Sequence, residues 1–135
     1  MGARYLADTN AIIDLVVGRL PLAAASWLQR QLGQQLVAIS VITRIELLTK
    51  TEPAAEYATM QAFVRDVQVF SFDEPVIRRT IALRQQYRVK LPDAIIAATA
   101  LAHGLVLVSR NERDFAGVSG LAVINPHDAV TLPPT

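Results

Sequence analysis

The sequence predicts an α/β fold, a three-layer α/β/α sandwich with a mostly parallel central sheet. Short apolar segments rich in valine, leucine and isoleucine alternate with longer segments of helical periodicity along the chain. Proline and glycine stand mostly between these segments, where turns are expected. The chain has 135 residues, of which 52% are hydrophobic, so it can bury a core but is too short for two ordinary domains. We therefore predict a single domain over residues 1–135.

The chain begins with a strand and two helices. Residues 5–7 are apolar and β-prone, and they predict a short first strand. A helix is expected over 10–17, ending at a glycine. The next helix is expected over 21–32, because proline favours the first turn of a helix and Gly33 can end it.

The middle of the chain repeats this pattern. Residues 36–39 form a continuous apolar run, which is typical of a buried parallel strand. Ser40 follows and can cap a helix over 41–49 by accepting a backbone N–H bond. Residues 53–67 carry apolar side chains at helical spacing, which predicts an amphipathic helix.

The C-terminal half adds three more strands and two more helices. Strands are predicted at 69–70, 105–108 and 122–124, and helices at 75–86 and 92–103. Both helices open on proline, and a glycine follows the second one. Short strands that alternate with helices favour a parallel sheet covered on both faces.

Composition excludes several classes of protein. The net charge is only +1, so any nucleic-acid surface must be a local patch. The absence of cysteine excludes a disulfide scaffold, a thiolate zinc site and thiol catalysis. The N-terminal residues do not resemble a signal peptide, and no apolar run approaches the roughly 20 residues that span a bilayer. We therefore expect a cytoplasmic protein with no membrane association.

Four carboxylates stand where the predicted strands and helices converge. Asp8 directly follows the first strand, and Asp114 lies six residues after Val108. In open α/β sheets, ligands bind at the carboxyl ends of the strands. Glu46 lies on the apolar edge of the helix that follows the second strand, and Asp93 opens a helix that is apolar almost all round. We expect these four acids to meet at one edge of the sheet.

Acids that converge in this way favour a metal site. Neighbouring carboxylates repel each other, so either their pKa values rise or a cation neutralises them. Mg²⁺ and Mn²⁺ suit all-oxygen sites, and such ions can activate water and stabilise a phosphodiester in transit. Each acid alone also has an ordinary explanation, such as a helix cap or an i,i+4 ion pair between Glu46 and Lys50. Convergence of all four favours the metal site over these explanations.

The other charged residues are interpreted more plainly. Asp14 is expected to be a surface or capping residue, and His127 to belong to a loose tail after Pro126. Basic residues close in sequence to the four acids can either hold phosphates or be solvated surface charges. They are Lys50, Lys90, Arg110 and Arg113.

Three ordered segments also carry a family resemblance. They read LADTNAII at 6–13, ISVITRIELL at 39–48, and LPDAIIAATA at 91–100 followed by GLVLVSRNERDF at 104–115. With these segments the sequence resembles the PIN-domain ribonucleases, and among them the VapC-type toxins of VapBC toxin–antitoxin pairs. The resemblance covers nearly the whole chain. The family often has a glycine where this chain has Thr49-Lys50, and Arg44 is unusually polar for its helix.

The resemblance implies a PIN fold and a Mg²⁺- or Mn²⁺-dependent endoribonuclease. It maps the family's four acids onto Asp8, Glu46, Asp93 and Asp114, which would be metal-binding and catalytic. Asn10 and Ser109 match polar positions that support the acids, and the four basic residues would then contact RNA. A homodimer, and inhibition by an antitoxin protein that covers the pocket, are also implied.

Two other functions remain open. A phosphoacceptor signalling domain would have paired acids at the first strand end and a lysine after a late strand, where this chain has Asp8 alone and Arg110. A catalytically silent module would use the acidic pocket to dock a basic peptide, and would bind its partner without metal-dependent cleavage.

Overall fold

The computed structural model describes residues 2–128 and 131–133. Within these residues five strands form one sheet in the order β3-β2-β1-β4-β5, and every pairing between neighbours is parallel. The predicted α/β fold is confirmed, with a wholly rather than mostly parallel sheet. The strands are β1 (Tyr5–Ala7), β2 (Val37–Ser40), β3 (Gln68–Phe70), β4 (Val106–Val108) and β5 (Val123–Ile124).

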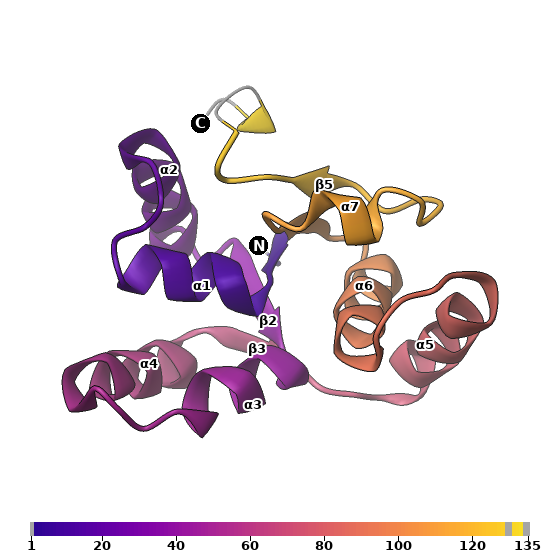
Figure 1. Ribbon diagram of the computed structural model, residues 1–135, viewed down its shortest axis with the longest axis horizontal. Helices are drawn as coiled ribbons and strands as arrows, with labels where there is room; N and C mark the ends of the chain where they lie inside the picture. Colours follow the sequence, from indigo (N-terminus) through magenta and orange to yellow (C-terminus); the bar gives the residue numbers. More distant parts are fainter. Residues whose placement is uncertain (1, 129–130, 134–135) are drawn as a thin grey trace.

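Helices cover both faces of the sheet, as Figure 1 shows. One face is covered by α1 (Thr9–Val16), α2 (Leu22–Gly33) and α4 (Ala54–Asp66). The other is covered by α5 (Glu74–Gln86), α6 (Leu91–His103) and the short α7 (Glu112–Phe115). The remaining helix, α3 (Val41–Thr49), contacts α1, α4 and α6 and so joins the two layers. None of the described helices is both long and apolar enough to cross a membrane.

The sheet divides the core into two apolar clusters. Tyr5 and Ala7 of β1 pack into the first cluster and Leu6 into the second, because successive side chains of a strand point to opposite faces. Trp27 of α2 lies in the first cluster, with its ring edge-on to that of Tyr5. Helix α6 is buried continuously from Ala94 to Ala100, as its apolar sequence predicts.

The helix boundaries follow from the residues that cap them. Ser40 caps α3 as predicted, and its Oγ accepts the backbone N–H of Thr43 at 3.3 Å. Helix α1 begins one residue earlier than expected, because Asp8 has an extended backbone and accepts the N–H of Ala11 as the N-cap. Pro21 precedes α2 rather than opening it.

The C-terminal region departs furthest from prediction. Helix α7 was not expected, since four residues give no readable periodicity, and it buries Phe115. The prediction of a loose tail after Pro126 is wrong for the part described: His127 contacts Asp14, and Leu132 packs against the first core cluster. Residues 129, 130, 134 and 135 of that predicted tail lie outside the described residues.

The strand order determines where a site can form. Chain connections run outward in both directions from the centre, so the direction reverses between β1 and β4. At such a switch point the loops after the two neighbouring strands separate and leave a crevice at their carboxyl ends. Asp8 directly follows β1, and Ser109 directly follows β4.

Candidate active site

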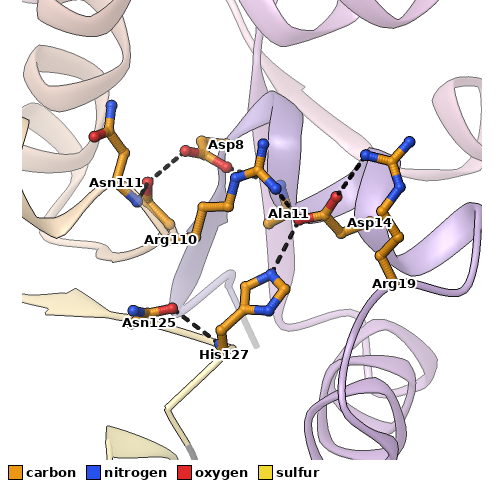
Figure 2. Close-up of polar contacts among 9 residues, drawn as sticks. Asp8, Ala11, Asp14, Arg19, Arg110, Asn111, Asn125 and His127 are labelled. Atoms are coloured by element: carbon orange, nitrogen blue, oxygen red, sulfur yellow. Dashed lines mark hydrogen bonds and ion pairs between the residues drawn. The ribbon is translucent and has the colours of Figure 1, made fainter.

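Asp8 is fixed at this switch point by both strands. Its backbone N–H donates to the carbonyl of Val108 at 3.0 Å, which extends the β1–β4 pairing. Its Oδ1 accepts the N–H of Ala11 at 2.9 Å, and its Oδ2 accepts the hydroxyl of Ser109 at 2.5 Å (Figure 2). The residue is only 6% exposed. Both oxygens of this buried carboxylate therefore have a defined direction.

The surroundings of Asp8 favour its neutral form. Burial raises the pKa of Asp8 most, and the carboxylate of Asp93 raises it further. The hydrogen bonds from Ser109 and Ala11 and the charge of Arg110 lower the pKa, but burial prevails. The carboxylate is thus in a place where an added cation would be favourable.

Asp93 connects the other acids to Asp8. It lies in the first turn of α6 and is half-buried. Burial raises its pKa, the carboxylates of Asp114 and Glu46 raise it further, and the ammonium of Lys90 partly offsets them. The charge of Asp93 in turn raises the pKa of Asp8. All four predicted acids therefore share one electrostatic environment at the carboxyl edge of the sheet.

Glu46 and Asp114 are the solvent-facing members of the four acids. Both are exposed. The hydroxyl of Thr9 donates to Oε1 of Glu46 at 2.5 Å, and the side-chain amide of Asn111 donates to Oδ2 of Asp114 at 2.6 Å. Each outer acid thus accepts a hydrogen bond from one uncharged side chain, and its second oxygen has no hydrogen-bond partner among the described residues.

The predicted setting of Glu46 needs a correction. It was expected at the edge of a buried apolar face, but Ile45 of that face is 56% exposed. Helix α3 instead buries Thr43 and Leu47, which lie four residues apart on one face. Thr43 is drawn inward because its hydroxyl contacts those of Thr9 and Ser40.

The two supporting residues predicted beside the acids have different positions. Ser109 contacts Asp8, as described above. Asn10 is exposed, and its side chain makes no hydrogen bond to the residues that the structure describes. Thr9 and Asn111 occupy the supporting positions at the two outer acids instead. Sequence reasoning missed both, although each lies within three residues of an acid.

Three of the four predicted basic residues, Lys50, Lys90 and Arg110, lie near one of the acids. Lys90 precedes α6 and acts on Asp93. Lys50 and Glu46 both line a cavity of about 130 Å³ between α1, α3 and α4. Arg113 is exposed on α7. Arg110 extends between Asp8 and Asp14, as Figure 2 shows.

The prediction that Asp14 is a surface or capping residue is wrong. Its side chain is 1% exposed, and it contacts Arg19, Arg110 and His127. Asp14 lies three residues after the buried Ala11, on the same face of α1. That spacing is the signal from which its burial could have been predicted.

The donor set fits a hard divalent cation. All four acids offer oxygen. Burial first, and neighbouring carboxylates second, raise the pKa values of Asp8 and Asp93, so the charged forms of both are disfavoured without a cation. Within residues 2–128 and 131–133, no three His, Asp or Glu side chains are arranged to hold an ion as they stand. Mg²⁺ needs only one or two carboxylates, because it keeps several waters. Asp8 and Asp93 would supply these two carboxylates. Glu46 and Asp114 are exposed, so their side chains could turn toward the same ion.

Known proteins are similar to this chain in sequence and in fold. Residues 5–121 match the PIN domain family. The tRNA(fMet)-specific endonuclease VapC of Shigella flexneri is 30% identical over 128 residues, which cover 87% of this chain and 94% of that protein.

Two solved structures give the same result in three dimensions. A chain of a toxin-antitoxin complex from Klebsiella pneumoniae is 35% identical, with a TM-score of 0.73 over 92% of this chain and 98% of that chain. A chain of VapBC2 from Rickettsia felis, bound to a DNA fragment from its promoter, has a TM-score of 0.77 over 90% and 97%. Its 20% identity shows the fold alone. The present chain therefore belongs to the PIN domain family, and within it to the VapC-type endonucleases.

Proposed function

We propose that this protein is a Mg²⁺- or Mn²⁺-dependent endoribonuclease and the toxin of a VapBC-type toxin–antitoxin pair. The observation that carries the proposal is the acid group at the switch point. Burial raises the pKa of both Asp8 and Asp93, and each is raised further by neighbouring acids. Asp8, Asp93, Glu46 and Asp114 would hold the ion. When bound, such an ion supplies an activated water and stabilises the charge on the phosphodiester.

The chain's own residues would orient the reaction. Hydrogen bonds from Ala11 and Ser109 to its two oxygens hold the Asp8 carboxylate in one orientation. Glu46 and Asp114 are exposed and each held by one neutral donor, so they can adjust as the substrate enters. The hydroxyl of Ser109 donates to a carboxylate and has no histidine beside it in the described part of the chain, so it is not placed as a nucleophile. Attack by water would leave a 5′-phosphate and a 3′-hydroxyl.

The substrate and the partner are proposed from the relatives. The Shigella protein is named as a tRNA(fMet)-specific endonuclease, which supports structured RNA as the substrate class. Sequence-specific RNA recognition mostly targets unstacked loops, and Lys50, Lys90, Arg110 and Arg113 would hold the phosphates of such a loop. The Klebsiella structure is a toxin–antitoxin complex, which supports an antitoxin as partner.

The test is cleavage of a mixed pool of cellular RNA by the purified protein, free of any antitoxin. Cleavage is expected with Mn²⁺ or Mg²⁺ and not with EDTA. Asp8→Asn keeps the size and capping ability of the side chain but removes its charge, and it should abolish cleavage. Asp66→Asn is the matched control, because Asp66 is an exposed acid at the end of α4. This control should cleave like the wild type.

Each result has a definite meaning. Full cleavage by a folded Asp8→Asn variant would remove Asp8 from the metal site. Absence of cleavage by a folded, metal-binding wild type would favour the docking module that binds a basic peptide in the acidic pocket.

A further inference from the structure

Asp14 is a buried carboxylate that the proposed metal chemistry does not use. Nη1 of Arg110 and Nε2 of His127 each lie 3.1 Å from its Oδ2, and Nη1 of Arg19 lies 3.7 Å from its Oδ1. These three side chains come from loops that follow α1, β4 and β5. An unpaired buried carboxylate is strongly destabilising, so Asp14 requires these partners. Three loops that lie apart in the sequence therefore meet at the carboxylate of Asp14.

Arg110 links this group to the acids. It directly follows Ser109, which donates to Asp8, and its positive charge lowers the pKa of Asp8. Figure 2 shows its guanidinium between Asp8 and Asp14. A guanidinium has five N–H donors, and the structure assigns only Nη1 a partner among the residues it describes. The side chain is 44% exposed, so its other donors can be reached from solvent.

His127 connects the same carboxylate to the segment that carries Asp114. A carboxylate only accepts hydrogen bonds, so Nε2 of His127 is the donor to Asp14. The backbone N–H of His127 donates to Oδ1 of Asn125 at 2.9 Å, and the amide of Asn125 donates to Glu112 in α7 at 2.6 Å. Oδ2 of Asp14 is therefore held by His127 as well as by Arg110.

We propose that Asp14 is a positioning residue that holds the guanidinium of Arg110 beside Asp8, where it binds an RNA phosphate next to the scissile bond. This rests on the proposed nuclease function. A free arginine loses much side-chain entropy when it binds, and a fixed partner removes part of that loss before the substrate arrives. The planar fork can pair with Asp14 on one side and with a phosphate on another.

Charge supports the division of the site into two parts. Two guanidinium groups, those of Arg19 and Arg110, face the carboxylate of Asp14. Around Asp93, carboxylates outnumber the ammonium of Lys90. A cation would therefore bind on the Asp93 side and a phosphate on the Arg110 side, with Asp8 between them.

RNA binding without cleavage tests the phosphate contact. Labelled oligouridine would be titrated with the protein in EDTA at several salt concentrations. Each phosphate contacted in a single strand contributes roughly 0.7 to the slope of log K against log salt concentration. Arg110→Gln should lower the magnitude of the slope by about 0.7. Arg78→Gln is the matched control, because Arg78 is also paired with a carboxylate, Glu74, but lies on α5. It should leave the slope unchanged.

A double-mutant cycle tests the positioning role. With Mn²⁺, Arg110→Gln should lower kcat/KM for RNA by about 10- to 100-fold, since misplaced contacts cost on that order. Asp14→Asn should lower it by about 10-fold in the wild type but less than about 2-fold in the Arg110→Gln background, because linked residues are not additive. An equal effect in both backgrounds would make Asp14 merely structural and overturn its positioning role.

Arg110→Lys provides a second test if Asp14→Asn does not fold. Lysine keeps the charge but lacks the fork that pairs in two directions, so kcat/KM should stay well below that of the wild type. Full activity of Arg110→Lys would overturn the proposal.

The two assays together distinguish this inference from the proposed nuclease function. If the wild type cleaves RNA while Arg110→Gln behaves like Arg78→Gln in both assays, this inference fails and the nuclease function stands. If the wild type does not cleave but the slope falls as expected, the phosphate contact stands and the nuclease fails.

Discussion

Asp8 combines a structural and a chemical task in one side chain. As the N-cap of α1 it accepts a backbone N–H, an interaction typically worth about 1 kcal/mol. Burial at the same time raises its pKa, so its charge is unfavourable in the absence of a cation. The cap fixes the direction of one oxygen and Ser109 that of the other. The site is thus preorganised by groups that also hold the fold together.

Ser109→Ala should weaken the site without unfolding the protein. The hydroxyl of Ser109 donates to Asp8 and accepts the N–H of Asn111 at 3.0 Å. Loss of such a supporting bond typically costs about 10- to 100-fold in metal affinity or activity. Mn²⁺ affinity and kcat/KM for RNA would both be measured, with exposed Ser119→Ala as the control. A folded Ser109→Ala variant with wild-type values for both would contradict this role.

Single residues differ in how far the sequence predicts them. Asp8 and Ser109 each follow an apolar run, so their place at the strand ends could be predicted. The burial of Asp14 was missed, because its partners Arg110 and His127 lie 96 and 113 residues further along the chain. Contacts over such separations have no local pattern, and a lone acid on a helix is most often exposed.

At the scale of elements, long periodic segments were predicted well and short ones poorly. Helix α3 was predicted with its observed bounds, because a strand end, a serine cap and a helical pattern follow one another there. Helix α7 has only four residues and was missed. It nevertheless carries Asp114, so the least predictable helix holds one of the four candidate acids.

Gly104→Ala should destabilise the fold through the end of α6. Gly104 has φ 65° and ψ 36°, a left-handed conformation that costs an L-residue roughly 1–2 kcal/mol. A Cβ there would meet no atom within 4 Å, so backbone strain alone is tested. Gly33→Ala is the matched control, since Gly33 ends α2 without a positive φ and with equal space. Urea unfolding should show a loss only for Gly104→Ala. Equal changes in the two variants would contradict the strain argument.

At the scale of the whole molecule, the site exists only when the chain is folded. Asp8, Glu46, Asp93 and Asp114 come from four segments, and the β1–β4 pairing joins residues about a hundred positions apart. Alternation of strands and helices predicts the edge at which the acids meet. It does not predict that β4 lies directly beside β1, because strand order depends on packing between distant segments.

Folding therefore gathers negative charge, and stability should depend on pH in a defined direction. The folded-state pKa values of Asp8 and Asp93 are raised, so their contribution to stability is present below the unfolded pKa of about 3.9. It is lost as the pH rises through the folded values. In EDTA at pH 7, Asp93→Asn should therefore be more stable than the wild type, and the difference should shrink as the pH falls. Asp66→Asn should show no such gain.

Added Mn²⁺ should reverse this order. At about 100 times its dissociation constant, a ligand that binds only the folded state adds about 2.7 kcal/mol to the free energy of unfolding. The wild type should gain about this much and Asp93→Asn much less, so the wild type becomes the more stable protein. The measurement is urea unfolding at pH 7 in EDTA and in Mn²⁺. The charged carboxylates that lower the stability of the protein in EDTA would then be the groups that bind Mn²⁺. If Mn²⁺ stabilised both proteins equally, the ion would bind elsewhere and the acids at the switch point would need another explanation.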